Sequence, residues 1–180
     1  MRGIVILASA ALAACAPSNA TTGGPPPVET VRVNGGGGSM TAEIHPTIAT
    51  MAAMVPHPLE RTWAALRAAY DSLAIPVTTL DQANHVIGNP DLKARRRLGE
   101  VPLGRYLNCG TTLGSPNTDT YEIRLSVLTS ARRDSSGGTI VMTTVDARGR
   151  PITISAEYTS CTSTGALEQR IVDLLKAQLR

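Results

Sequence analysis

The segment PLERTWAALRAAYDSL, residues 58–73, decides the fold class of this 180-residue chain. Its large apolar residues recur every three or four positions, which places them on one face of an α-helix. They are Leu59, Trp63, Leu66, Tyr70 and Leu73. Pro58 suits the start of a helix, where its missing N–H is not needed, and Pro76 marks the end. The segment therefore predicts an amphipathic helix that packs on a sheet.

Two aromatic residues on this face, Trp63 and Tyr70, allow two interpretations. They could form a cage for a ligand, or they could pack the helix onto the sheet. Large apolar side chains at helical spacing are typical of core packing. We therefore favour packing.

Strand-like segments flank this helix. Residues 49–55 are a candidate first strand. After the helix, IPVTTL (75–80) and HVIGN (85–89) flank a turn-like tetrad, which predicts a β-hairpin. Residues 90–117 are expected to be irregular, with a short helical turn around residues 103–107.

The segment TYEIRLSVLT, residues 120–129, alternates apolar and polar side chains and predicts a half-buried strand. Glu122 and Arg124 fall on its polar face. TIVMTTVDA (139–147) and ITISAEYTS (152–160) predict two further strands, and ARRDSSGG (131–138) and ARGRP (147–151) predict the turns between them. These segments together predict an antiparallel meander.

Residues 164–180 predict a terminal amphipathic helix. Its apolar face consists of Leu167, Ile171, Leu174, Leu175 and Leu179. Two helices and one antiparallel sheet indicate an α+β two-layer sandwich with both helices on the same face.

This order of elements resembles the helix-grip fold. The stretch from residue 55 through TWAALRAAYDSLAIPV is similar to the start of such domains in the BamC family of outer-membrane assembly lipoproteins. In that family, too, a Trp-containing helix leads into a strand. The resemblance implies the fold and, by analogy, an accessory role in outer-membrane assembly. The resemblance does not assign a functional role to any residue of this chain.

The N-terminus predicts a secretory signal peptide, because a basic residue, Arg2, precedes an apolar run over residues 3–14. The run is too short for a membrane span, which needs about 20 residues. LAAC, residues 12–15, resembles the lipobox of bacterial lipoproteins. That resemblance implies cleavage before Cys15, a diacylglyceryl group on its thiol and an acyl chain such as palmitate on its new amino group. The alternative is an ordinary signal peptide with a chance cysteine.

The lipobox resemblance also implies a location in the cell envelope. Ala16 follows Cys15 where an Asp favours retention in the inner membrane, so the outer membrane, facing the periplasm, is expected. The Gly- and Pro-rich composition of residues 17–39 predicts a flexible tether, in which Val28, Val31 and Val33 could form a brief strand. The expected organisation is a signal peptide (1–14), a lipidated cysteine with its tether (15–40) and one α+β domain (41–180).

The formal net charge is +3 and the pI is about 9.0. A basic pI can indicate nucleic-acid binding, but an exported, anchored protein rarely meets nucleic acid, so none is expected as a partner. Cys109 and Cys161 remain once Cys15 carries lipid. An even pair in an oxidising compartment predicts a disulfide. A catalytic or metal-binding thiol pair is the alternative.

No catalytic, metal or cofactor motif stands out. His45, His57 and His85 are scattered, so a zinc site would need three separate elements to converge. The sequence contains neither a nucleophile elbow nor a phosphate-binding loop, and most acidic residues fall in predicted turns. A small-molecule carrier or hydrolase with a pocket between sheet and helix is the alternative function.

The sequence KARRRLG is the one unusual concentration of charge. We identify as candidate anion-binding or partner-binding residues Lys93, Arg95, Arg96, Arg97 and Arg105. Guanidinium groups suit phosphate and carboxylate groups, and a solvated loop is the alternative. The sequence therefore predicts an envelope-anchored, non-enzymatic lipoprotein that binds a protein or an anionic envelope polymer. It leaves the oligomeric state open.

Overall fold

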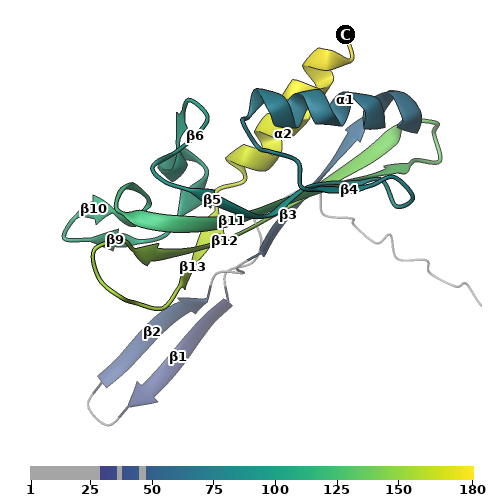
Figure 1. The fold of residues 1–180 in the computed structure, drawn as a ribbon. Helices are drawn as coiled ribbons and strands as arrows, with labels where there is room; N and C mark the ends of the chain where they lie inside the picture. The colour runs from purple at the N-terminus through teal and green to yellow at the C-terminus, as the bar shows by residue number, and fades with distance from the viewer. Residues whose placement is uncertain (1–28, 36–37, 45–47) are drawn as a thin grey trace, which may run out of the picture.

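The computed structural model describes residues 29–35, 38–44 and 48–180. The signal peptide, the lipobox with Cys15 and the first part of the predicted tether lie outside the described residues. Within them, helices α1 (Leu59–Ser72) and α2 (Ala166–Gln178) cover the same face of one antiparallel sheet (Figure 1). This arrangement confirms the predicted α+β two-layer sandwich. Neither helix has the length and hydropathy of a membrane span.

The main sheet has seven strands in the described residues, and each strand runs antiparallel to its neighbours. In spatial order they are β4 (Thr79–Asp81), β5 (Val86–Ala94), β11 (Tyr121–Arg133), β12 (Thr139–Pro151), β13 (Thr159–Ser163) and β8 (Leu107–Asn108), with β3 (Ile48–Val55) also beside β12. Strand β3 pairs with residues 139–146 of β12, and β13 pairs with residues 147–149. The predicted hairpin is confirmed as the β4–β5 pair, and the strand predicted over residues 49–55 is confirmed as β3, although β1 and β2 precede it.

Between β5 and β11 the chain makes an excursion over residues 95–120. It contains β6 (Arg97–Leu98), β7 (Val101–Pro102), the 3₁₀ helices η1 (Leu103–Arg105) and η2 (Asn117–Asp119), and the short hairpin β9 (Thr111–Thr112) with β10 (Ser115–Pro116). The predicted helical turn is confirmed as η1. The predicted Cys109–Cys161 disulfide is also confirmed, with an S–S distance of 2.04 Å, and it ties the excursion to β13.

Four predicted boundaries are wrong. Strand β11 continues to Arg133, so the turn predicted over residues 131–138 is shorter than expected. Residues 90–94 continue strand β5 instead of starting the irregular stretch. The segment ARGRP is not a turn, because β12 continues to Pro151 opposite the start of β11. As a consequence, residues 152–158 form a loop where a third strand was predicted, and only residues 159–163 form β13.

Gly149 explains how a turn-like sequence fits within a strand. A Cβ atom at Gly149 would lie 2.7 Å from Cδ1 of Ile123 and 3.5 Å from Sγ of Cys161. Its missing side chain therefore makes room for the core and the disulfide, which is a recognised use of glycine inside strands.

Strands β1 (Glu29–Gly35) and β2 (Gly38–Ile44) pair as an antiparallel hairpin that spans the predicted boundary between tether and domain at residue 40, and the hairpin projects away from the main sheet (Figure 1). Val31 and Val33, expected as a brief strand, belong to β1. The flexible tether stays a prediction for residues 17–28, which lie outside the described part of the chain.

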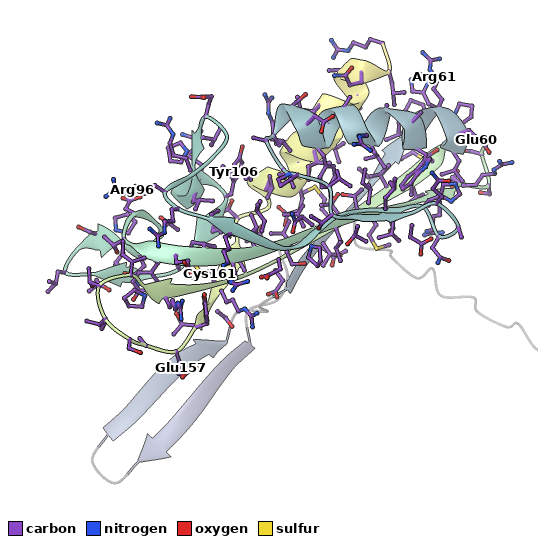
Figure 2. All side chains as sticks on the ribbon, viewed as in Figure 1. Glu60, Arg61, Arg96, Tyr106, Glu157 and Cys161 are labelled. Atoms are coloured by element: carbon purple, nitrogen blue, oxygen red, sulfur yellow. A yellow bond between two sulfur atoms is a disulfide. The ribbon has the colours of Figure 1, made fainter. Side chains whose placement is uncertain are left out.

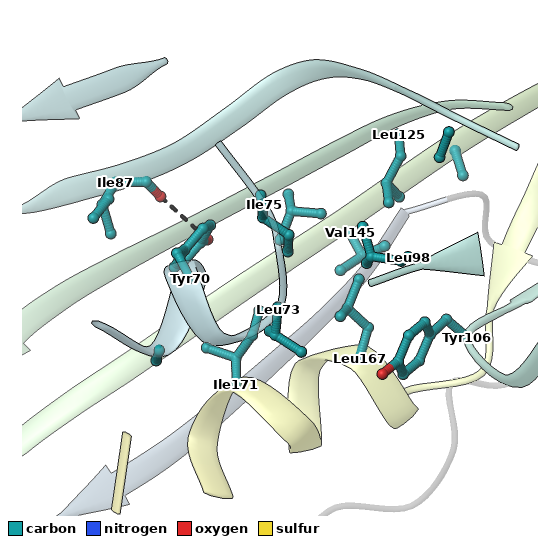
Figure 3. Packing of buried hydrophobic residues seen from close by; sticks show 14 of the residues in the cluster. Tyr70, Leu73, Ile75, Ile87, Leu98, Tyr106, Leu125, Val145, Leu167 and Ile171 are labelled. Carbon is teal, nitrogen blue, oxygen red and sulfur yellow. Dashed lines mark hydrogen bonds between the residues drawn. The ribbon is translucent and has the colours of Figure 1, made fainter. Parts of the chain in front are cut away.

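Apolar side chains from both layers fill the space between helices and sheet (Figure 3). Tyr70 is fully buried, and its hydroxyl group lies 2.8 Å from Oγ1 of Thr129 and donates to the carbonyl oxygen of Ile87 at 3.3 Å. Trp63 is half-buried against the same core and meets His85 edge to face. The packing interpretation is therefore confirmed. From the predicted face of α2, the fully or nearly fully buried residues are Leu167, Ile171, Leu175 and Leu179.

Candidate functional site

The face of the sheet opposite the helices, here called the open face, carries a group of charged side chains. Side chains alternate along β11, so the buried Ile123 and Leu125 point to the core while Arg124 points to the open face. The strand register places Arg124 opposite Lys93 of β5 and opposite Arg148 of β12. Three cations therefore lie side by side across three neighbouring strands.

A second row lies one step further along the strands. Glu122 pairs with Arg150 in the register of β11 and β12, and Arg95 follows Ala94, the β5 partner of Ile123. Together with two flanking residues, the two rows form what we call the open-face cluster: Asp91, Lys93, Arg95, Glu122, Arg124, Arg148, Arg150 and Tyr158. Five cations against two carboxylates leave it with three net positive charges.

Tyr158, from the loop between β12 and β13, connects the members of the cluster. Its hydroxyl group donates to Oε1 of Glu122 at 2.7 Å and accepts a hydrogen bond from Nε of Arg124 at 3.4 Å. The guanidinium carbons of Arg150 and Arg148 lie 4.7 Å and 5.4 Å from the centre of its ring. These are cation–π distances. Tyr158 thus holds both arginines in place over the end of the sheet.

Glu122 is the central carboxylate of the cluster. Its side chain is 17 % exposed, and guanidinium nitrogens of Arg150 and Arg95 lie 3.2 Å and 3.6 Å from it. The hydrogen bond from Tyr158, with the charges of these two arginines, holds the pKa of Glu122 below its usual value despite some desolvation. The carboxylate is therefore ionised at neutral pH.

Arg124 has its own partners on the same face. Its guanidinium pairs with Asp91. The hydrogen bond with Tyr158, together with the charge of Asp91, raises the pKa of Arg124. Because Arg124 and Glu122 both keep their charge across neutral pH, the cluster is suited to binding anions rather than to transferring protons.

A half-open cleft of about 360 Å³ lies beside the cluster. Its lining is Arg95, Glu122, Arg150 and residues 151–155 of the loop after β12. The volume lies at the lower end of the range for ligand sites. Two guanidinium groups at its wall suit a phosphate or carboxylate group.

The basic residues predicted as one site are divided between several places. Lys93 and Arg95 belong to the open-face cluster. Arg96 and Arg97 line a second cleft, of about 490 Å³, in the excursion. Both donate to main-chain carbonyl oxygens: Nε of Arg96 to Asp119 at 3.1 Å, and Arg97 to Glu100.

Arg105 lies apart from both clefts. It is the last residue of η1, and the next residue, Tyr106, packs into the core beside α2 (Figure 3). In Figure 2, Arg96 lies above the sheet and Glu157, in the loop that also holds Tyr158, lies below it. The five predicted residues therefore do not form a single surface.

Sequence reasoning missed six members of the cluster: Asp91, Glu122, Arg124, Arg148, Arg150 and Tyr158. The alternation of TYEIRLSVLT already placed Arg124 beside Glu122 on the polar face of a strand. The spacing of Arg148 and Arg150 carries the same signal, since residues two apart in a strand share a face. The signal was lost because ARGRP was predicted to be a turn.

The remaining candidate residues do not converge. In the described part of the chain, no three His, Cys, Asp or Glu side chains come close enough to hold a metal ion, and His45 lies outside it. Both Cys109 and Cys161 are in the disulfide, which rules out the alternative of a free thiol pair.

Glu168, in the first turn of α2, was also missed. It is 0 % exposed, accepts a hydrogen bond from Oγ of Ser163 at 2.7 Å, and has no partner at Oε2 among the described residues. Burial raises its pKa.

Compared with known proteins, the chain matches no protein-family model and no curated protein.

Proposed function

We propose that this protein is a non-enzymatic, lipid-anchored protein of the bacterial cell envelope that binds an acidic protein or an anionic envelope polymer through the open-face cluster. The observation that carries this proposal is the row of Lys93, Arg124 and Arg148. Like charges directly opposite one another on neighbouring strands destabilise a sheet. Asp91 and Glu122 offset only two of the five cations of the cluster, and an anionic partner would neutralise the rest.

The anchor is supported by the N-terminal sequence. A basic residue, a short apolar run and LAAC, residues 12–15, fit lipidation at Cys15 and removal of residues 1–14. The Cys109–Cys161 disulfide fits an exported protein, since disulfides persist in oxidising compartments. Ala16 favours the outer membrane, facing the periplasm. An accessory role in outer-membrane assembly rests on fold analogy, and fold alone does not determine function.

The alternative, a small-molecule carrier or hydrolase, needs a pocket between the sheet and the helices. The two clefts described above lie on the open face and in the excursion. Between the layers, side chains of the core such as Tyr70, Ile87 and Leu167 are packed together (Figure 3). No specific observation therefore favours the alternative.

Binding can be measured with two surface-bound probes, poly-L-glutamate and lipopolysaccharide, and the full-length chain purified from membranes in detergent. The test variant is Arg148→Gln with Arg150→Gln. The control is Arg67→Gln with Arg132→Gln, which removes the same charge from exposed residues outside the cluster. Hydrogen bonds to charged groups contribute about 1.5–3 kcal/mol each, so the test variant should bind at least one probe roughly tenfold more weakly.

The control variant should keep nearly all of its affinity, and binding of the unchanged chain should fall as salt screens the charges. Equal losses in both variants would show that only net charge matters. An unchanged affinity in the test variant would show that the open-face cluster is not the binding site. Either result would refute the proposal.

A further inference from the structure

Aliphatic side chains are exposed at the same end of the sheet as the open-face cluster. In the described residues, three of the five exposed large apolar side chains lie at this end: Leu113 at 102 % exposure, Ile152 at 51 % and Ile154 at 65 %. Isolated exposed apolar residues are ordinary, but several on neighbouring loops mark an interaction surface.

The strand register brings the two loops together. Leu113 occupies the tip of the β9–β10 hairpin, and η2 leads from this hairpin into β11. The first residue of β11, Tyr121, pairs with Pro151, and Ile152 follows directly. Figure 1 shows the β9–β10 hairpin and the loop after β12 at the same end of the sheet. Arg95 and Arg150 lie at this end too, in the cleft that Ile152 and Ile154 help to line.

The backbone at the hairpin tip is also unusual. Leu113 has a φ of 50°, in the left-handed region that few non-glycine residues adopt. A side chain at 102 % exposure contributes nothing to the core that could compensate for this conformation. Gly114, the other residue of this two-residue turn, has a φ of 79°, and such a turn requires positive φ at both positions, so the turn explains the backbone and only the exposure of the Leu113 side chain is left unexplained.

We infer that this end of the domain binds the surface of an anionic lipid bilayer, with Leu113, Ile152 and Ile154 entering the interface and the arginines of the open-face cluster lying among the headgroup phosphates. This inference rests on the part of the proposed function that makes the open-face cluster an anion-binding surface, and it assigns that surface a lipid bilayer in place of a protein or polymer. Apolar side chains beside a cationic surface match a bilayer, which offers hydrocarbon below a negatively charged layer. A hydrated polymer offers only the charge.

The point at which the chain enters the main sheet supports contact of this end of the domain with the bilayer. Ile48 of β3 pairs with Asp146 of β12, two residues before Arg148. The segment that connects Cys15 to the domain therefore enters the sheet beside the open-face cluster. A chain anchored at Cys15 would therefore be attached to the domain at the end that carries the exposed loops.

Tryptophan fluorescence reports contact of the loops themselves with the bilayer, even in a chain that is anchored at Cys15. Full-length chains carrying Leu113→Trp or Ile154→Trp are reconstituted in vesicles of phosphatidylethanolamine and phosphatidylglycerol, with or without brominated acyl chains. The matched control is Gln82→Trp, an exposed residue in the turn between β4 and β5. Trp63 on α1 is common to all chains, so its emission is subtracted.

We expect the emission added by Leu113→Trp and by Ile154→Trp to shift to shorter wavelength and to be quenched by the brominated chains. The emission added by Gln82→Trp should do neither. Quenching should weaken in phosphatidylcholine vesicles and after Arg148→Gln with Arg150→Gln.

Water-exposed emission from both loop variants in anionic vesicles would overturn the inference. Binding of poly-L-glutamate, which has no hydrocarbon chain, by the same chains then separates the two proposals. If the binding persists and still requires Arg148 and Arg150, the open-face cluster serves a protein or polymer and only the membrane contact is wrong. If the binding is also absent, both proposals are wrong.

Discussion

Removing the Cys109–Cys161 disulfide should destabilise the protein by an amount that follows from its place in the chain. The bond closes a loop with a sequence separation of 52. The chain-entropy relation gives about 4 kcal/mol for a loop of this length at 25 °C, because the open loop gains conformational freedom in the unfolded state. For a domain of this size, that loss lowers the melting temperature by roughly 10–20 °C.

Loss of the disulfide should also increase local opening, mainly in the excursion and β13. The disulfide connects the excursion to β13, and the other contacts between them are few: the short β8–β13 pairing and hydrogen bonds from Thr164 to the carbonyl oxygens of Arg105 and Tyr106. Without the bond, these contacts should open more often. The β3–β12 pairing is long and lies at the other end of β12, so it should remain protected.

The variant to measure is Cys109→Ala with Cys161→Ala. Alanine is chosen over serine because both cysteines are buried and a serine would bury a hydroxyl group there. Urea denaturation gives the free energy of unfolding, and hydrogen–deuterium exchange gives the local opening. The wild-type chain under reducing conditions is the control and should behave like the variant. A change in the free energy of unfolding below about 1 kcal/mol, or equal acceleration of exchange in β3 and β8, would refute the reasoning.

Three further predictions concern single residues. Gly88→Ala should abolish folding, seen as loss of soluble protein and of its circular dichroism, because Gly88 has a φ of 155° and a Cβ would collide with the carbonyl oxygen of Val127. Burial raises the pKa of Glu168 in the folded state, so the stability it contributes is present below the carboxyl group's ordinary pKa and is lost as pH rises through the raised pKa. Glu168→Gln should remove this fall in the urea midpoint, and a fall that persists would assign it to another group. In the variant Cys15→Ser, the protein should no longer carry a diacylglyceryl group and should leave the membrane fraction. Unchanged labelling of the variant by a lipid precursor would contradict lipidation at residue 15.

The helices were predictable because their signal is local. The spacing of Leu66, Tyr70 and Leu73 matches the helical repeat, and Pro76 follows where α1 has ended. The alternation in β11 is equally direct, since its buried residues are every second one. In both cases the pattern depends only on which side of one element faces the core.

The end of β12 could not be predicted in this way, because its cause lies elsewhere in the chain. Arg-Gly-Arg-Pro has the composition of a turn. In the fold, Gly149 is needed within the strand because Ile123 and Cys161 approach its backbone. A contact between three segments far apart in the sequence thus overrides the local preference. The predicted third strand was displaced to residues 159–163 for the same reason.

The error at β12 also explains why Arg148 and Arg150 were not among the predicted site residues. A run such as Lys93 to Arg97 draws attention because its charges are adjacent in sequence, yet neighbours in a strand point to opposite faces and the run is divided where β5 ends. The charges that do meet are Lys93, Arg124 and Arg148, brought together by the register of three strands. Arg124 and Arg148 are each unremarkable in their own segments. Their effect depends on pairing, so a cationic surface on a sheet must be sought across strands, after the register is known.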